Sequence, residues 1–136
     1  MPVFNITYNV PKIIQEINFR LGKPHRLIDR LKLGGIGSRR MVVDSRSPNF
    51  DPYMLQQHYL TYTNIELRPQ GIMIHIHKKL ENYAWVLSFC SFSFRKKQQN
   101  LIIEAEQGFI EFRDAFVFNQ AFIDKLIQQA QQQDKY

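Results

Sequence analysis

Cysteine is nearly absent, and this scarcity is the first constraint on the chain. Cys90 is the only cysteine in 136 residues, so no disulfide can form within the chain. It lies between Phe89 and Phe92, which predicts a small, buried structural thiol; a nucleophilic thiolate would need a base or cation beside it. A chain without disulfides is typical of a reducing compartment, and we expect a cytoplasmic protein.

Long apolar runs and common catalytic motifs are also missing. No run approaches the roughly 18 apolar residues of a membrane helix, and no basic-then-apolar leader opens the chain. We therefore expect neither a transmembrane segment nor a secretory signal. The patterns G-x-S-x-G, H-E-x-x-H and G-x-G-x-x-G do not occur, which favours a protein that is not an enzyme and needs no cofactor.

The positive charge is confined to one part of the chain. Residues 1–46 hold nine Lys and Arg against three acidic residues, whereas residues 47–136 hold nine of each, so the first third carries the whole net charge of +6. A basic segment of this kind is typical of polyanion binding. The length indicates one domain over residues 1–136.

Residues 59–118 carry the pattern of an antiparallel meander. Ile72, Ile74 and Ile76 alternate with Met73, His75 and His77, which predicts a strand with one half-buried face. In the strand before it, Ile65 and Leu67 alternate with Glu66 and Arg68, which places these two charged residues on a solvent-exposed face. The turn residues 68–71, Arg-Pro-Gln-Gly, indicate a hairpin before this strand. The parity of the apolar residues changes near Cys90, which predicts a bulge or a break between two strands.

An amphipathic helix is predicted to close the meander. It begins near Asn119, a good N-cap residue, and its apolar stripe comprises Phe122, Ile123, Leu126, Ile127 and Ala130. The last turn has no apolar contact, and we expect it to fray before Tyr136.

Two short helices are predicted near the start, after a short strand over residues 3–8. The first follows Pro11 and buries Val10, Ile13, Ile14, Ile17 and Leu21. The second, between residues 24 and 33, carries Leu27, Ile28 and Leu31 inward, with Arg26 and Arg30 on a more exposed side. Residues 41–43 form a brief strand, and residues 44–52 an exposed loop.

A glycine-rich loop is the first candidate site. Residues 34–37 are Gly-Gly-Ile-Gly, and Arg39 and Arg40 follow. Glycines let backbone N–H groups approach an anion, and arginine pairs with phosphate oxygens. Arg26, Arg30, Arg39 and Arg40 are thus candidate anion ligands. The loop lacks the GxxxxGK[ST] spacing, so a solvated helix stop is the alternative interpretation.

A pair of histidines is the second candidate site. His75 and His77 share one strand face and could reach one metal ion, with His58 or Glu66 as the nearest candidate for a third ligand. The neighbouring isoleucines occupy the buried face. Two surface histidines are therefore the plainer interpretation.

A family resemblance appears in the second half of the chain. Trp85 in a strand, the segments 101–104 and 108–113, and Ala115-Phe116 before a C-terminal amphipathic helix together resemble bacterial PH-like domains over residues 60–130. The resemblance implies an α+β fold in which a strongly bent antiparallel meander, or partly open barrel, is capped by the C-terminal helix. The two short N-terminal helices depart from that pattern. PH-like folds bind phosphoinositide headgroups or peptides.

Two functions therefore compete. One is a non-enzymatic PH-like interaction module that holds a protein partner with an exposed sheet edge or a loop end and exposes an apolar patch. The other is a binder of nucleic acid or anionic lipid, which would gather its basic residues on one face. The sequence decides neither the ligand nor the oligomeric state.

Overall fold

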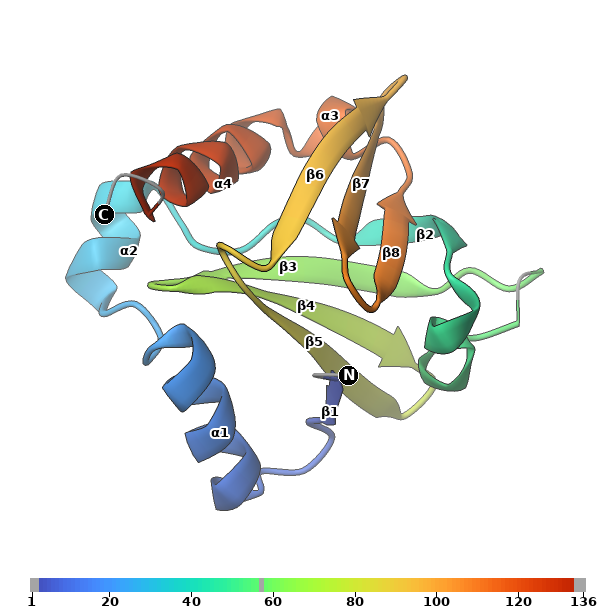
Figure 1. Ribbon diagram of the computed structural model, residues 1–136, viewed down its shortest axis with the longest axis horizontal. Helices are drawn as coiled ribbons and strands as arrows, with labels where there is room; N and C mark the ends of the chain where they lie inside the picture. The colour runs from blue at the N-terminus through green and yellow to red at the C-terminus, as the bar shows by residue number, and fades with distance from the viewer. Residues whose placement is uncertain (1–2, 57, 134–136) are drawn as a thin grey trace.

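The fold is α+β, with one open antiparallel sheet of eight strands and helices at its margins (Figure 1). The computed structural model describes residues 3–56 and 58–133. The strand order is β1-β5-β4-β3-β2-β8-β7-β6. The strands are β1 (Val3–Asn5), β2 (Met41–Arg46), β3 (Tyr62–Arg68), β4 (Gly71–Lys78), β5 (Glu81–Ser88), β6 (Phe92–Lys97), β7 (Asn100–Ala105) and β8 (Gly108–Phe112). The helices are α1 (Pro11–Leu21), α2 (Leu27–Leu33), α3 (Ala115–Phe118) and α4 (Gln120–Gln133), with a 3-10 helix η1 (Pro48–Tyr53).

The meander follows from alternation and from turns between successive strands. β3 and β4 pair in register from Tyr62 opposite His77 to Arg68 opposite Gly71, so the predicted hairpin at residues 68–71 is confirmed. The change of parity near Cys90 is a break between β5 and β6. These two strands are consecutive in the chain but lie far apart in the sheet order, because β6 pairs with β7 at the opposite edge.

The sheet bends at β2, which joins its two halves. Met41 and Val42 of β2 pair with β3, and its residues from Val43 onward pair with β8, with a register shift between Val43 and Ser45. An irregularity of this kind bends a strand and increases its twist. In Figure 1 the strands β3, β4 and β5 accordingly run across the direction of β6, β7 and β8.

The main core lies inside this bend. Ile72, Ile74 and Ile76 are fully buried there, as the alternation predicts, and α4 packs against the same core. The predicted stripe of α4 is confirmed, since Leu126 is fully buried and Ile127, which is partly buried, packs against the same residues. The predicted fraying before Tyr136 lies outside the described residues.

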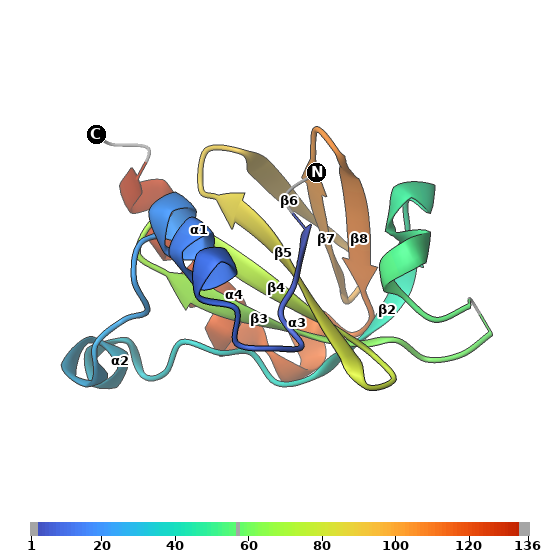
Figure 2. The same cartoon turned by 90° about the horizontal axis from the view of Figure 1, so that it is seen from below.

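The outer face of the sheet is covered in part by α1. Figure 2 shows this helix lying across the strands of the sheet. Ile17 and Leu21 pack with Met73, Ala84 and Val86 in a cluster separate from the main core. The short strand β1 pairs with β5 and leads into this helix. Gly22 ends α1 with a φ of +80°, a conformation that favours glycine.

Three sequence predictions are wrong in this part of the structure. Cys90 is exposed, because it lies in the turn between β5 and β6 rather than within a strand. Residues 44–52 are not a simple loop: β2 continues to Arg46, and η1 buries Phe50 against Trp85 with ring centroids 4.6 Å apart. The first strand stops at Asn5 instead of reaching residue 8.

The helix α2 forms where it is predicted, but its apolar face is reversed. Leu27, Ile28 and Leu31 were expected to point inward, yet 72%, 67% and 73% of their surfaces are exposed. No residue of α2 is buried. In α1, Val10 and Ile14 of the expected stripe are also exposed.

Candidate functional site

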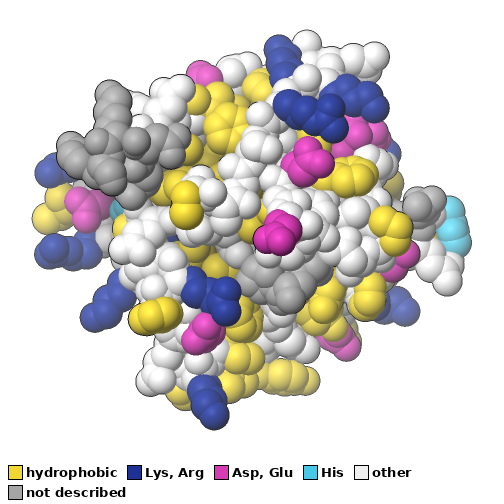
Figure 3. Space-filling model, in the orientation of Figure 1, with side chains coloured by type: hydrophobic (Ala, Val, Ile, Leu, Met, Phe, Trp, Pro, Cys, Tyr) yellow, Lys and Arg dark blue, Asp and Glu magenta, His cyan; other side chains and the backbone are white. Residues whose placement is uncertain are grey.

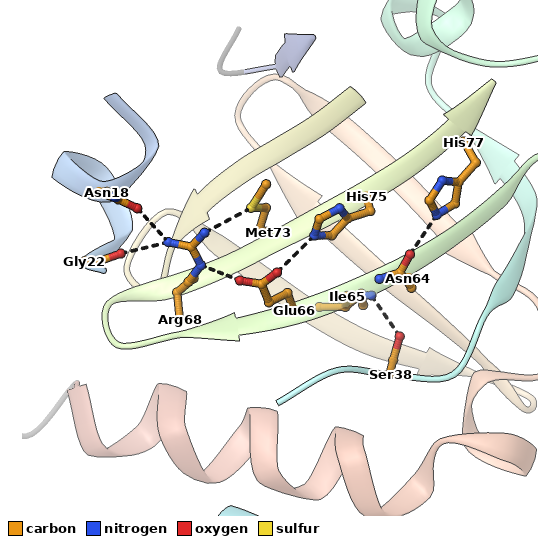
Figure 4. A network of polar contacts seen from close by, with 10 residues as sticks. All are labelled: Asn18, Gly22, Ser38, Asn64, Ile65, Glu66, Arg68, Met73, His75 and His77. Atoms are coloured by element: carbon orange, nitrogen blue, oxygen red, sulfur yellow. Dashed lines mark hydrogen bonds and ion pairs between the residues drawn. The ribbon is translucent and has the colours of Figure 1, made fainter. Parts of the chain in front are cut away.

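A polar cluster lies on the outer face of the β3–β4 hairpin (Figure 4). Glu66 and Arg68 are two residues apart on β3 and therefore share a face, and His75 lies diagonally opposite on β4. Glu66 Oε1 is 3.2 Å from His75 Nε2, and Glu66 Oε2 is 2.5 Å from Arg68 Nε. The hairpin register therefore brings one carboxylate between two basic groups.

Arg68 extends this cluster to α1. Its Nη1 donates to Asn18 Oδ1 and to the carbonyl oxygen of Gly22, both at 3.0 Å, and its Nη2 lies 3.8 Å from Met73 Sδ. Only 8% of its surface is exposed. Because the last carbonyl groups of a helix lack partners within the helix, a cation at this position satisfies and stabilises the end of α1.

The carboxyl group of Glu66 is ionised at neutral pH. Burial raises its pKa, but hydrogen bonds from His75 and Arg68, together with the Arg68 charge, outweigh burial and lower the pKa from 4.5 to about 2. An ionised carboxylate only accepts hydrogen bonds, so the Nε2 of His75 must carry the proton that it shares with Glu66. The cluster is thus a charge-balanced Glu–Arg pair with an oriented histidine.

The two predicted metal-ligand histidines do not converge on one point. His75 contacts Glu66, whereas the ring nitrogens of His77 lie 2.7 Å from Asn82 Oδ1 and 2.8 Å from Asn64 Oδ1. Within residues 3–56 and 58–133, no group of three or more His, Cys, Asp or Glu side chains is arranged to hold a metal ion. Of the two third-ligand candidates, Glu66 is near His75 and His58 is exposed.

A cleft of about 260 Å³ opens between α1 and this polar cluster. Ile13, Ile14 and Ile17 of α1 form an apolar wall, and Glu66 and His75 are part of the opposite side. Concave sites with an apolar lining and a few convergent polar groups are the usual form of small-molecule sites. A carboxyl group with a strongly shifted pKa adds weight to this position, since such groups gather at functional sites.

The four candidate anion ligands occupy two separate segments. Arg26 is the N-cap residue that precedes α2 and Arg30 lies within the helix, where its Nε donates to the carbonyl oxygen of His25 at 3.0 Å. Arg39 and Arg40 lie in the chain that leads to β2, where the Arg40 guanidinium stacks 5.1 Å from the centroid of Tyr62. In Figure 3 the Lys and Arg side chains stand in separate places around the view.

Several backbone donors in and after the glycine-rich loop bond within the protein. The N–H groups of Gly34 and Gly35 donate to carbonyl oxygens of α2, and that of Ser38 donates to Ile65 at 2.8 Å. The N–H of Arg39 donates to Asn119 Oδ1 at 2.7 Å. The loop thus ends α2 and then continues along β3. Anion binding by the four arginines stays a prediction that rests on their side chains.

A second candidate surface is the exposed face of α2. It consists of Leu27, Ile28 and Leu31, flanked by basic residues. Lys125 of α4 donates to the carbonyl oxygens of Gly34 and Gly35 at 2.9 and 3.4 Å, and this contact ties the end of α2 to the body. We call these three aliphatic side chains the α2 apolar face.

Sequence reasoning missed both surfaces for different reasons. Alternation places Glu66 and Arg68 on a solvent-exposed strand face. The hairpin register would have placed His75 on the same face of the sheet, beside Glu66. The α2 apolar face could not be found this way, because apolar spacing reveals a stripe but not whether anything covers it. Helix α1 packs beside the polar cluster, whereas no other element among the described residues covers the α2 apolar face.

A comparison with family models, curated proteins and solved structures found no match for this chain. None of the helices in the described ranges is long and apolar enough to span a bilayer.

Proposed function

We propose that the chain is a non-enzymatic interaction module that binds an acidic amphipathic helix of a protein partner through the α2 apolar face. The observation that carries this proposal is the exposure of Leu27, Ile28 and Leu31, at 72%, 67% and 73% of their surfaces, on a helix that buries none of its residues. Positions i, i+1 and i+4 form one stripe, the spacing with which helices engage apolar partners.

The charges around the stripe favour an acidic partner over a second copy of the chain. Arg26, Arg30 and Lys32 accompany the stripe, and Asp29 is the only acidic residue of α2. Two such helices placed together would repel, whereas a helix with Asp and Glu beside its apolar stripe would complement these charges.

The PH-like resemblance supports a binding role in general terms. Strands β2 to β8 form a bent meander against which α4 packs, the kind of arrangement that the resemblance implies. A fold of this kind leaves the ligand open, so the partner is argued from α2 alone. Binding to nucleic acid or anionic lipid is the competing proposal. It has less support, because the four candidate arginines lie on two separate segments.

The test is a selection from a random-peptide library with the full chain as target. We expect enriched peptides that combine Leu, Ile or Phe at helical spacing with Asp and Glu. The double variant Ile28→Ser/Leu31→Ser should weaken their binding at least tenfold, because it removes most of the apolar contact. Leu80→Ser is the matched control, since Leu80 is 91% exposed in the β4–β5 turn.

Two results would contradict the proposal. One is a set of selected peptides without acidic residues, or peptides that bind the double variant as tightly as the parent. The other is binding of phosphatidylserine vesicles that the same double variant abolishes while no peptide is enriched, which would assign the α2 apolar face to a membrane surface. Moderate salt should weaken peptide binding only in part, because it screens the basic residues that flank the stripe and leaves the apolar contact in place.

A further inference from the structure

The cleft beneath α1 is a second site, independent of the α2 apolar face. The sheet covers only part of the apolar face of α1. Ile17 is buried against the sheet, but Ile14 keeps 44% of its surface exposed. Ile13, Ile14 and Ile17 all line the cleft of about 260 Å³, across from Glu66 and His75. An apolar wall thus faces a polar floor across open space.

The carboxylate on this floor is already engaged by two basic side chains, Arg68 and His75. The Glu66 carboxylate is balanced by Arg68, and the guanidinium is already engaged by Glu66, Asn18, Gly22 and Met73. An anionic ligand would meet the carboxylate without gaining the arginine. A cationic ligand would compete with the arginine for the carboxylate. A neutral ligand avoids both costs.

The floor offers mainly hydrogen-bond acceptors. His75 Nε2 donates to the Glu66 carboxylate, so in the neutral imidazole the other nitrogen, Nδ1, is an acceptor. Within the described part of the chain, Nδ1 of His75 has no hydrogen-bond partner, and the residue lines the cleft. Figure 4 shows the bond from its other ring nitrogen to Glu66. The carboxylate oxygens also keep free lone pairs. The complementary group on a ligand is therefore a donor.

The size of the cleft limits the ligand. At about 260 Å³ the cleft lies just below the roughly 300–1,000 Å³ typical of pockets for drug-sized ligands, so it suits a smaller molecule. We infer that this cleft binds a small neutral molecule with an aliphatic body against the isoleucines of α1 and a hydroxyl group that donates to His75 Nδ1.

The experiment compares two isomers on the full chain. 1-Hexanol and methyl pentyl ether have the same atoms, but only the alcohol has a donor. We expect titration followed by amide chemical shifts to perturb α1 and β4, and to give about fivefold tighter binding for the alcohol, the worth of one neutral hydrogen bond. Hexanoate and hexylammonium should both bind more weakly than the alcohol.

Two matched variants identify the acceptor. His75→Phe should reduce the preference for the alcohol over the ether to about one, whereas His77→Phe, two residues along the same strand, should retain it. If His75→Phe does not fold, Ile14→Ser provides a second test of the cleft. Because Ile14 is a half-exposed residue of the apolar wall, this variant should weaken binding of the alcohol and the ether by the same factor and leave the preference unchanged.

The inference is overturned if the ether binds as tightly as the alcohol, if either charged probe binds more tightly, or if His77→Phe abolishes the preference while His75→Phe does not. Shifts confined to residues outside α1, β3 and β4 would place the binding elsewhere and overturn it as well. None of these outcomes depends on whether α2 binds a partner helix.

Discussion

Arg68 is the side chain that fastens the N-terminal helix to the sheet. Its guanidinium joins Glu66 on β3 to Asn18 and Gly22 at the end of α1, and it is almost completely buried. A buried guanidinium is tolerated only when its donors have partners. The position of α1 therefore depends on an ion pair that belongs to the sheet.

The ion pair predicts how stability changes in acid. The pKa of Glu66 is lowered from 4.5 to about 2, so between these values the unfolded chain binds a proton that the folded chain does not. Stability from this group is present above pH 4.5 and is lost as the pH falls toward 2, by up to about 3 kcal/mol. We expect the free energy of unfolding of the parent to fall toward that of Glu66→Gln over this range, as measured by urea denaturation.

The control is Glu104→Gln, which removes an exposed carboxylate from β7. Its difference from the parent should stay within about 0.5 kcal/mol at every pH. A difference between the parent and Glu66→Gln that does not change from pH 6 to pH 2.5 would show that the ion pair does not stabilise the folded state.

At the residue scale, the sequence predicted which face of a strand a side chain occupies better than it predicted which residues that side chain contacts. Alternation placed Ile72, Ile74 and Ile76 in the core, and they are there. The same alternation put Glu66 on a wet face, because nothing local in the sequence shows that α1 returns to cover it. Cys90 was misplaced for a similar reason, since apolar neighbours do not distinguish a strand from a turn.

At the scale of elements, α4 and α2 have similar patterns and opposite surroundings. Both carry aliphatic residues at helical spacing. Leu126 of α4 is fully buried in the main core, whereas Leu31 of α2 has 73% of its surface exposed. Spacing predicted both helices and the buried face of α4 correctly, but whether a stripe is covered depends on residues far away in the chain.

This contrast predicts unequal costs for the same substitution. Leu126→Ala should lower the free energy of unfolding by roughly 2–5 kcal/mol, because it leaves a cavity in the core. Leu31→Ala should change it by less than about 0.5 kcal/mol, since the side chain already meets solvent. Thermal or urea unfolding of both variants measures the two values, and equal losses would mean that α2 packs against the body or that α4 does not.

At the scale of the molecule, the bent sheet distributes the basic segment instead of collecting it. The first 46 residues contain β1, α1, α2 and β2, which lie at different places around the sheet. The sequence showed how much charge this segment has and predicted the meander and its closing helix. It did not show the sheet order, because the pairing of β2 with both β3 and β8 is set by residues distant in the chain.

The spread of charge makes a prediction about nucleic acid. Arg39→Ala/Arg40→Ala should change the free energy of unfolding by no more than about 1 kcal/mol. The backbone N–H of residue 39 keeps its bond to Asn119, and the only interaction lost among the described residues is the stacking of Arg40 on Tyr62. Lys96→Ala/Lys97→Ala removes the same charge and also one stacking interaction, between Lys96 and Phe116. If binding follows overall charge, both double variants should weaken association with a DNA duplex equally at low salt.

The salt dependence separates the two remaining functions. A dedicated polyanion site at Arg39 and Arg40 would lose affinity only in the arginine variant, and the slope of log affinity against log salt would fall by roughly two, about one for each phosphate that is no longer neutralised. We expect instead equal and small slopes in both variants, measured by fluorescence anisotropy with labelled duplex, because charges on separate elements cannot follow one backbone. A loss specific to the arginine variant would favour the polyanion function over the α2 apolar face.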